Sequence, residues 1–205
     1  MNVQEALNEL RKEEKRKFDQ TLDLIINLRG MDVKKENINL IIVLPNKIKE
    51  KKVCGFLKSK SPLIPTITEP EFSKYKDKKA LKNLVKNYDY FISLAQLMPS
   101  VATTFGKILG PVGKMPSPQL GVISEEKESA IREALEKIAV STKIRIKEPS
   151  IKLMIGKESM KDQEIIENVE FFYKSLLNAL PKKIENVKSV MIKFTMTKPI
   201  KLEIK

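Results

Sequence analysis

The densest run of residues that could do chemistry is 106–121, Gly-Lys-Ile-Leu-Gly-Pro-Val-Gly-Lys-Met-Pro-Ser-Pro-Gln-Leu-Gly. It holds four of the chain's seven glycines and three of its eleven prolines. A P-loop cradles phosphate through backbone N–H groups, and it needs Gly five residues before Gly-Lys and Ser or Thr after it. Ile108 and Met115 occupy these two positions around Gly113-Lys114. The phosphate motif therefore fails, and the Gly and Pro content predicts a loop shaped by backbone geometry.

Composition narrows the catalytic options further. The chain has no histidine, which excludes a His general base, a Ser-His-Asp triad and a His-ligated metal. Its single cysteine, Cys54, can form neither an internal disulfide nor a Cys-rich zinc site, which favours an intracellular protein. We therefore expect no enzyme activity and no cofactor. A metal-dependent RNA-processing enzyme that uses carboxylates stays open as an alternative, although no tight Asp-x-Asp cluster occurs.

The charge balance indicates the class of partner. The 39 Lys and Arg residues outnumber the 26 Asp and Glu residues, so the net charge is +13. A chain this basic is expected to bind a polyanion: nucleic acid, an anionic membrane surface or an acidic protein. The longest uninterrupted apolar run, Leu40 to Leu44, is far shorter than the roughly 20 residues of a membrane helix. The start of the chain does not resemble a secretory signal, so we expect no membrane partner.

One predicted strand carries a basic stripe. In residues 143–147 three cations, Lys143, Arg145 and Lys147, alternate with two isoleucines, so the cations share one face. A stripe of this kind is commonly a solvated sheet face or protection of a sheet edge. In a chain of charge +13, contact with nucleic acid is the competing interpretation.

Elements at both chain ends must position these groups. The spacing of Val3, Ala6, Leu7 and Leu10 predicts an amphipathic helix. Alternating residues predict strands from Phe18 to Leu28 and from Ser189 to Thr197, and a helix is expected from about Asp162. The remaining end elements are two further predicted strands, at 38–44 and 151–155. The first of these is apolar on both faces, which predicts a central strand.

The middle of the chain has a different order of predicted strands and helices. Buried strands are predicted at 52–57 and 90–94, between amphipathic helices, and this alternation indicates a parallel α/β sheet. We predict a discontinuous antiparallel α+β domain of residues 1–49 and 141–205, with an α/β domain, 50–140, inserted into it. The discontinuous domain has 24 basic and 16 acidic side chains, a net charge of +8, and the inserted one has 15 and 10, a net charge of +5.

A family resemblance becomes specific in the glycine-rich segment. Residues 109–118, Leu-Gly-Pro-Val-Gly-Lys-Met-Pro-Ser-Pro, resemble the signature of the L-one family of large-subunit ribosomal proteins. Three further segments agree in order and spacing: 17–21 (Lys-Phe-Asp-Gln-Thr), 43–45 (Val-Leu-Pro) and 188–196, from Lys-Ser-Val to Thr-Met. The resemblance covers essentially the whole chain. It implies the same arrangement of an inserted domain, and the form of the chain's start favours an archaeal-type member.

The resemblance implies a cytoplasmic, non-enzymatic protein that binds ribosomal RNA at the mobile stalk beside the tRNA exit site. It also implies repression of the protein's own messenger RNA, contact with exit-site tRNA, and a monomer away from the ribosome. The discontinuous domain would hold the RNA surface. The matching positions are Lys17, Phe18, Thr21, Ser189, Thr195, Met196 and Thr197, with Lys147 and Lys152 as further candidates.

Some of these positions have plain structural interpretations. Phe18 and Met196 fall on the apolar parity of their predicted strands, which by itself predicts burial in the core. Thr197 stands where the family usually has Gly, and a Cβ there would crowd an approaching RNA backbone or forbid a positive φ.

A basic scaffold protein that binds an acidic protein is an alternative function. It would share the positive charge of this chain but not a preference for RNA.

Overall fold

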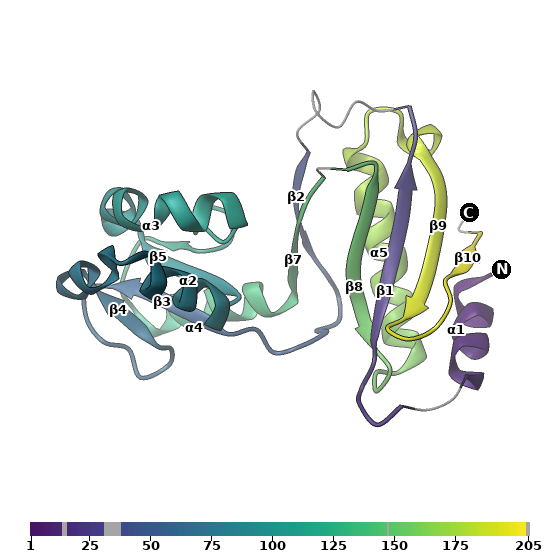
Figure 1. Ribbon diagram of the computed structural model, residues 1–205, viewed down its shortest axis with the longest axis horizontal. Coiled ribbons are helices and arrows are strands. Elements are labelled where there is room, and N and C mark those ends of the chain that lie inside the picture. The colour runs from purple at the N-terminus through teal and green to yellow at the C-terminus, as the bar shows by residue number, and fades with distance from the viewer. Residues whose placement is uncertain (14–15, 31–37, 147, 204–205) are drawn as a thin grey trace. The chain divides into compact units, whose positions relative to one another are not determined.

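The computed structural model describes residues 1–13, 16–30, 38–146 and 148–203 and divides into two compact units (Figure 1). Unit 1 comprises Met1–Ile48 and Val140–Lys205, and unit 2 comprises Lys49–Ala139. The predicted mixed class is confirmed, because the chain contains both an antiparallel and a parallel sheet. Lys147, one of the predicted contact residues, lies outside the described residues.

Unit 1 is built on a four-stranded antiparallel sheet of order β10-β9-β1-β8. The strands are β1 (Thr21–Leu28), β8 (Ser150–Lys157), β9 (Val187–Phe194) and β10 (Ile200–Leu202). Even-numbered residues of β1 are buried and odd-numbered ones are half-buried. The buried face packs against α5 (Asp162–Ala179), which lies behind the sheet in Figure 1, and the N-terminal helix α1 (Val3–Lys12) completes this core. No helix of the described part of unit 1 covers the other sheet face, which is toward the viewer in Figure 1 and is called the open face.

A two-stranded ribbon, β2 (Asn39–Val43) with β7 (Ser141–Arg145), belongs to the same unit. Ile42 and Ile144 turn into the core of unit 1, whereas Val43 is exposed. The prediction that β2 is a central strand is therefore wrong. In the described part of the chain β2 pairs only with β7, and its second apolar face reaches the surface.

Unit 2 has a parallel sheet of order β4-β3-β5-β6. Its strands are β3 (Val53–Leu57), β4 (Thr66–Thr68), β5 (Tyr90–Leu94) and β6 (Val122–Ile123), and its helices are α2 (Lys78–Asn87), α3 (Met98–Val112) and α4 (Glu128–Val140). Two strands and a helix meet in an aromatic cluster: the ring of Phe56 lies 5.5 Å from that of Phe91 and 4.7 Å from that of Phe105. Short 3-10 helices span Glu69–Lys76 and Ala95–Leu97 in unit 2, and Lys183–Asn186 in unit 1.

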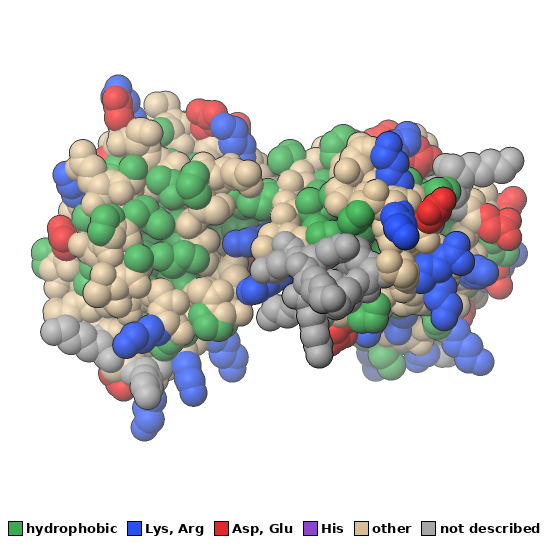
Figure 2. All heavy atoms as spheres, turned by 90° about the horizontal axis from the view of Figure 1, so that it is seen from above, with side chains coloured by type: hydrophobic (Ala, Val, Ile, Leu, Met, Phe, Trp, Pro, Cys, Tyr) green, Lys and Arg blue, Asp and Glu red, His purple; other side chains and the backbone are tan. Residues whose placement is uncertain are grey.

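The glycine-rich segment is only partly a loop. Its first residues belong to α3, so the prediction of a loop from residue 106 is wrong. Val101, Phe105 and Leu109 form a buried stripe at helical spacing, which stabilises the helix despite its glycines. The exposed side of α3 is poor in charge, and Figure 2 shows hydrophobic side chains gathered on that side of unit 2. The helix ends at Gly113, whose φ of 77° favours glycine.

Lys114, which follows this cap, has a structural partner. Its ammonium donates hydrogen bonds to the backbone carbonyls of Val85 (2.8 Å) and Tyr88 (2.7 Å), at the end of α2. A cation at this position satisfies free carbonyls and opposes the negative end of the helix dipole. The Gly-Lys pair therefore joins two helices of unit 2, in agreement with the failed phosphate motif.

Candidate nucleic-acid interface

Three strand ends meet at one end of the open sheet of unit 1. There β1 begins, β9 ends and β8 ends, because Thr21 pairs with Lys157 and Leu22 with Phe194 (Figure 1). This register brings together Thr21 and Thr195, which lie 174 positions apart. We give the name sheet-end surface to the predicted contact residues at these strand ends, which are Thr21, Thr195 and Met196, with Lys17 and Phe18 shortly before β1.

Two threonines connect the strand ends. The backbone N–H of Thr21 donates to the Thr195 hydroxyl oxygen at 3.2 Å, and the two hydroxyl oxygens are 3.0 Å apart. The Thr195 hydroxyl also lies within 3.4 Å of the Thr21 carbonyl oxygen. A hydroxyl has one donor and two acceptor positions, so this exposed pair can still bond a further hydroxyl group. The ribose 2′-hydroxyl, which is both donor and acceptor, is a partner of that kind.

Phe18 and Met196 are large apolar side chains in solvent. Phe18 is 52% exposed and Met196 is 60% exposed, so the burial predicted from strand parity is wrong for both. The reason is that β1 begins at Thr21 and β9 ends at Phe194. Side chains alternate between the two sheet faces only within a strand, and both residues lie outside the strands. Exposed aromatic and apolar groups beside polar ones are suited to stacking on bases.

A buried glutamine that the sequence interpretation missed holds this surface in place. Gln20 is 3% exposed, and its side-chain oxygen accepts a hydrogen bond from the backbone N–H of Met196 at 3.2 Å. Its side-chain amide donates to the Glu158 carboxylate at 3.2 Å, and its backbone carbonyl accepts from the backbone N–H of Glu158 at 2.8 Å. Gln20 shares the buried parity of Leu22, and a polar residue on that parity was the available signal.

Asp19 organises the adjoining turn. Its carboxylate accepts hydrogen bonds from the backbone and the hydroxyl of Ser159, both at 3.0 Å, and pairs with the Lys157 ammonium at 3.2 Å. Desolvation acts to raise the pKa of Asp19, but these hydrogen bonds and the nearby ammonium outweigh it and hold the pKa below its ordinary value. A charged Asp19 thus connects the start of β1 to the turn after β8.

Thr197 closes the turn after β9 with a buried side chain. Its hydroxyl accepts from the Phe194 N–H at 2.9 Å and lies 3.4 Å from the Phe194 carbonyl oxygen. Among the described non-glycine residues only Lys183 has a positive φ, so Thr197 occupies ordinary backbone. A glycine is therefore not required for the backbone path here, and the threonine supplies a hydrogen bond that a glycine could not.

We expect Thr197→Val to lower the free energy of unfolding by about 1–3 kcal/mol, because the buried Phe194 N–H would lose its acceptor. Thr197→Ser retains the hydroxyl and is the matched control, with a smaller loss. Chemical denaturation of the three proteins measures the difference. Equal stability of the valine and serine variants would show that the hydroxyl does not hold the turn.

The remaining predicted residues lie elsewhere on the sheet. Ser189 is at the opposite end, where its hydroxyl accepts from the Asn27 amide at 3.0 Å, and the Asn27 oxygen accepts from Ser150 at 2.9 Å. Lys152 is exposed and in register with Ile25 on the open face. From Thr21 to Asn27, β1 covers about 20 Å at roughly 3.3 Å per residue.

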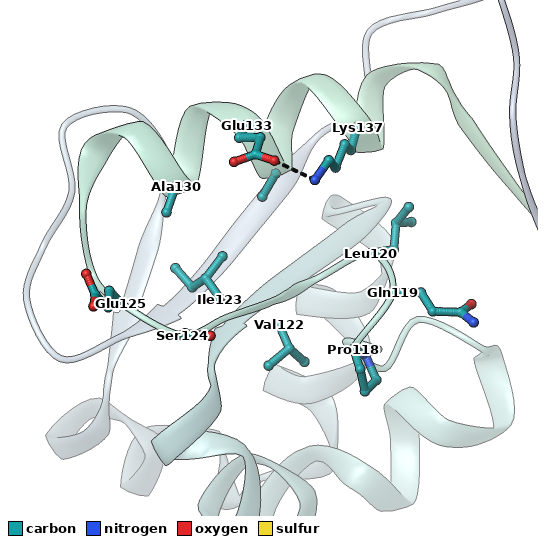
Figure 3. Close-up of a pocket in the computed structure, with 11 residues that line it drawn as sticks. Pro118, Gln119, Leu120, Val122, Ile123, Ser124, Glu125, Ala130, Glu133 and Lys137 are labelled. Carbon is teal, nitrogen blue, oxygen red and sulfur yellow. Dashed lines mark hydrogen bonds and ion pairs between the residues drawn. The ribbon is translucent and has the colours of Figure 1, made fainter.

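Unit 2 offers a competing pocket of about 370 Å³ between β6 and α4 (Figure 3). Its charged lining residues are occupied: the Lys137 ammonium is 2.6 Å from the Glu133 carboxylate, and Glu125 pairs with Lys127. In the described parts of the chain no group of three or more Cys, Asp or Glu side chains could hold a metal ion. None of the helices within those parts is long and apolar enough to cross a membrane.

Comparison with known proteins gives a consistent result. The model of the ribosomal protein L1p/L10e family matches residues 10–198. The large ribosomal subunit protein uL1 of Methanothermococcus thermolithotrophicus is 33% identical over 214 residues, which cover 98% of each chain. The uL1 of Methanobrevibacter smithii is 34% identical over 95% of each chain. That of Thermofilum pendens is 34% identical over 98% of this chain and 92% of its own.

Proposed function

Because this chain belongs to the ribosomal protein L1p/L10e family, and to its archaeal type, we propose that it binds large-subunit ribosomal RNA through the open face of unit 1. Its relatives are structural proteins of the large ribosomal subunit, and this chain is likewise a structural protein and not an enzyme. The observation that supports RNA binding best is the exposed hydroxyl pair of Thr21 and Thr195, together with the exposed apolar side chains of two residues close to them in sequence.

In this proposal each part of the sheet-end surface recognises a different part of the RNA. The threonine hydroxyls bond ribose 2′-hydroxyls, Phe18 and Met196 contact bases or riboses, and Lys17 neutralises a phosphate. Gln20 and Thr197 position the surface without contacting RNA, since both side chains are buried. Residues 1–49 and 141–205, the discontinuous domain predicted from the sequence, have a net charge of +8. This charge adds a general attraction for the polyanion.

The finer assignments follow from the family resemblance and are part of the same proposal. The RNA would be that of the mobile stalk near the tRNA exit site, with exit-site tRNA as a further partner. The protein would repress translation of its own messenger RNA through a similar RNA structure. It would be a monomer away from the ribosome and would reside in the cytoplasm with it.

A filter-binding titration tests the proposal. We expect the protein to bind a large-subunit stalk RNA fragment more tightly than a scrambled RNA, and more tightly than DNA of the same sequence at matched salt, because DNA lacks the 2′-hydroxyl. Equal affinity for RNA and DNA would overturn the ribose mechanism. A complex that copurifies with the protein and resists nuclease would favour an acidic protein partner instead.

A further inference from the structure

A groove of about 300 Å³ lies within unit 1, between β7 and the edge strand β8. Residues 143–146 line one side and residues 150–153 the other. In the described part of the chain β7 pairs only with β2, and β8 only with β1, so the strand edges that border the groove have no strand partner there. The groove is therefore a gap between two sheets in one unit, bordered by free strand edges.

Three exposed cations line this groove: Lys143, Arg145 and Lys152. Within the described residues none of the three forms an ion pair, and the one carboxylate in the lining, that of Glu148, pairs with none of them. Desolvation, and then the charge of Arg145, lower the pKa of Lys143. Among the described side chains nothing compensates the repulsion between these cations, and a bound anion would relieve it.

The cations of the groove point away from the core of unit 1, and one of them lies on the open face of the main sheet. Ile144 and Ile146 point into the core, so Lys143 and Arg145, at alternate positions, point away from it. Lys152 stands opposite Ile25 on the open face of the main sheet. The groove thus borders the main sheet along its edge strand β8, beginning at the end of the sheet where Asn27 and Ser150 meet.

We propose that this groove binds phosphates of the RNA backbone, at a second site whose β8 residues lie about 10–20 Å along the strands from Thr21. The inference rests on the proposed function and adds a location to it. Lys143 and Arg145 are two residues apart, about 6.6 Å along the strand, so each can meet its own phosphate. The guanidinium can bond two phosphate oxygens at once, whereas the lysines act as point charges.

The test is a salt titration of binding to stalk RNA and to scrambled RNA by the full chain and two double variants. The groove variant is Lys143→Gln with Arg145→Gln, and the control, Lys82→Gln with Lys86→Gln, removes the same charge from exposed positions on α2 of unit 2. Each lost phosphate contact lowers the slope of log affinity against log salt by about 0.7–0.9. We expect the groove variant to lose about 1.5 in slope with both RNAs, and the control less than half of that.

Equal slopes for the groove variant and the unmodified chain, or equal losses in both variants, would overturn the site. Unchanged thermal melting confirms that the groove variant is folded. If the unmodified chain does not prefer stalk RNA but the groove variant still loses slope, the proposed function fails and the phosphate site stands. Tight binding of a polyglutamate peptide at the same ionic strength, abolished only in the groove variant, would overturn the RNA assignment in favour of an acidic protein.

Discussion

Replacing Phe18 and Met196 together with alanine is expected to weaken binding of stalk RNA by about 10- to 1,000-fold at fixed salt. An aromatic side chain that stacks on a base contributes about 1–3 kcal/mol, and Met196 adds apolar contact beside it. Because both side chains are more than half exposed in the free protein, their removal leaves no cavity in the core. Filter binding measures the loss, and the salt slope should stay unchanged, since no charge is removed.

Ile184→Ala supplies the matched control for this double variant. Ile184 is also in unit 1 and is 58% exposed, but it lies in the short helix Lys183–Asn186, outside the sheet-end surface. Its replacement should leave RNA affinity unchanged. A loss as large as that of the double variant would mean that general surface hydrophobicity, rather than this surface, supports binding.

Thr195→Val is the second change for which we expect a large effect, a loss of roughly 1–3 kcal/mol in binding of stalk RNA. Valine has nearly the shape of threonine, but it cannot accept from the Thr21 N–H or bond a ribose hydroxyl. The loss should fall on the specific complex, so that the preference for stalk RNA over scrambled RNA shrinks. Competition between the two RNAs measures that preference directly.

Thr195→Ser separates the two roles of the hydroxyl from the shape of the side chain. Serine retains the hydroxyl, so affinity close to that of the unmodified chain is expected. Hydrogen exchange at the Thr21 amide reports the internal bond independently of RNA. Full RNA affinity in the valine variant, together with faster exchange, would restrict Thr195 to joining β1 and β9.

The sheet-end surface and the groove would act on different properties of the same complex. The surface carries hydroxyl and apolar groups, which can distinguish a folded RNA by its ribose and base positions. The groove has three cations and one carboxylate among its described lining residues, and this excess positive charge contributes affinity and salt dependence without reading sequence. Variants of the threonines and apolar side chains of the surface should change specificity, and variants of the groove cations should change the response to salt.

Much of the fold followed from local patterns. All four apolar residues of the predicted N-terminal helix, from Val3 to Leu10, are buried in α1, and the predicted strand at 90–94 is β5. The wrong predictions concern segments whose structure depends on tertiary packing and not on the local sequence pattern. Apolar residues on both faces of β2 suggested a central strand, although one face reaches solvent, and the glycines of α3 suggested a loop, although a buried stripe stabilises a helix.

The sequence by itself determined the chemistry available to this protein: excess positive charge, no histidine, hydroxyl and apolar groups near both chain ends, and the motifs of its family. The tertiary structure alone decided which of these groups meet. Thr21 and Thr195 are brought into contact by the register of β1 with β9, and the groove exists because β7 pairs with β2 instead of β8. Composition and periodicity depend on neighbours along the chain, whereas strand pairing and register depend on the whole core, which no local window contains.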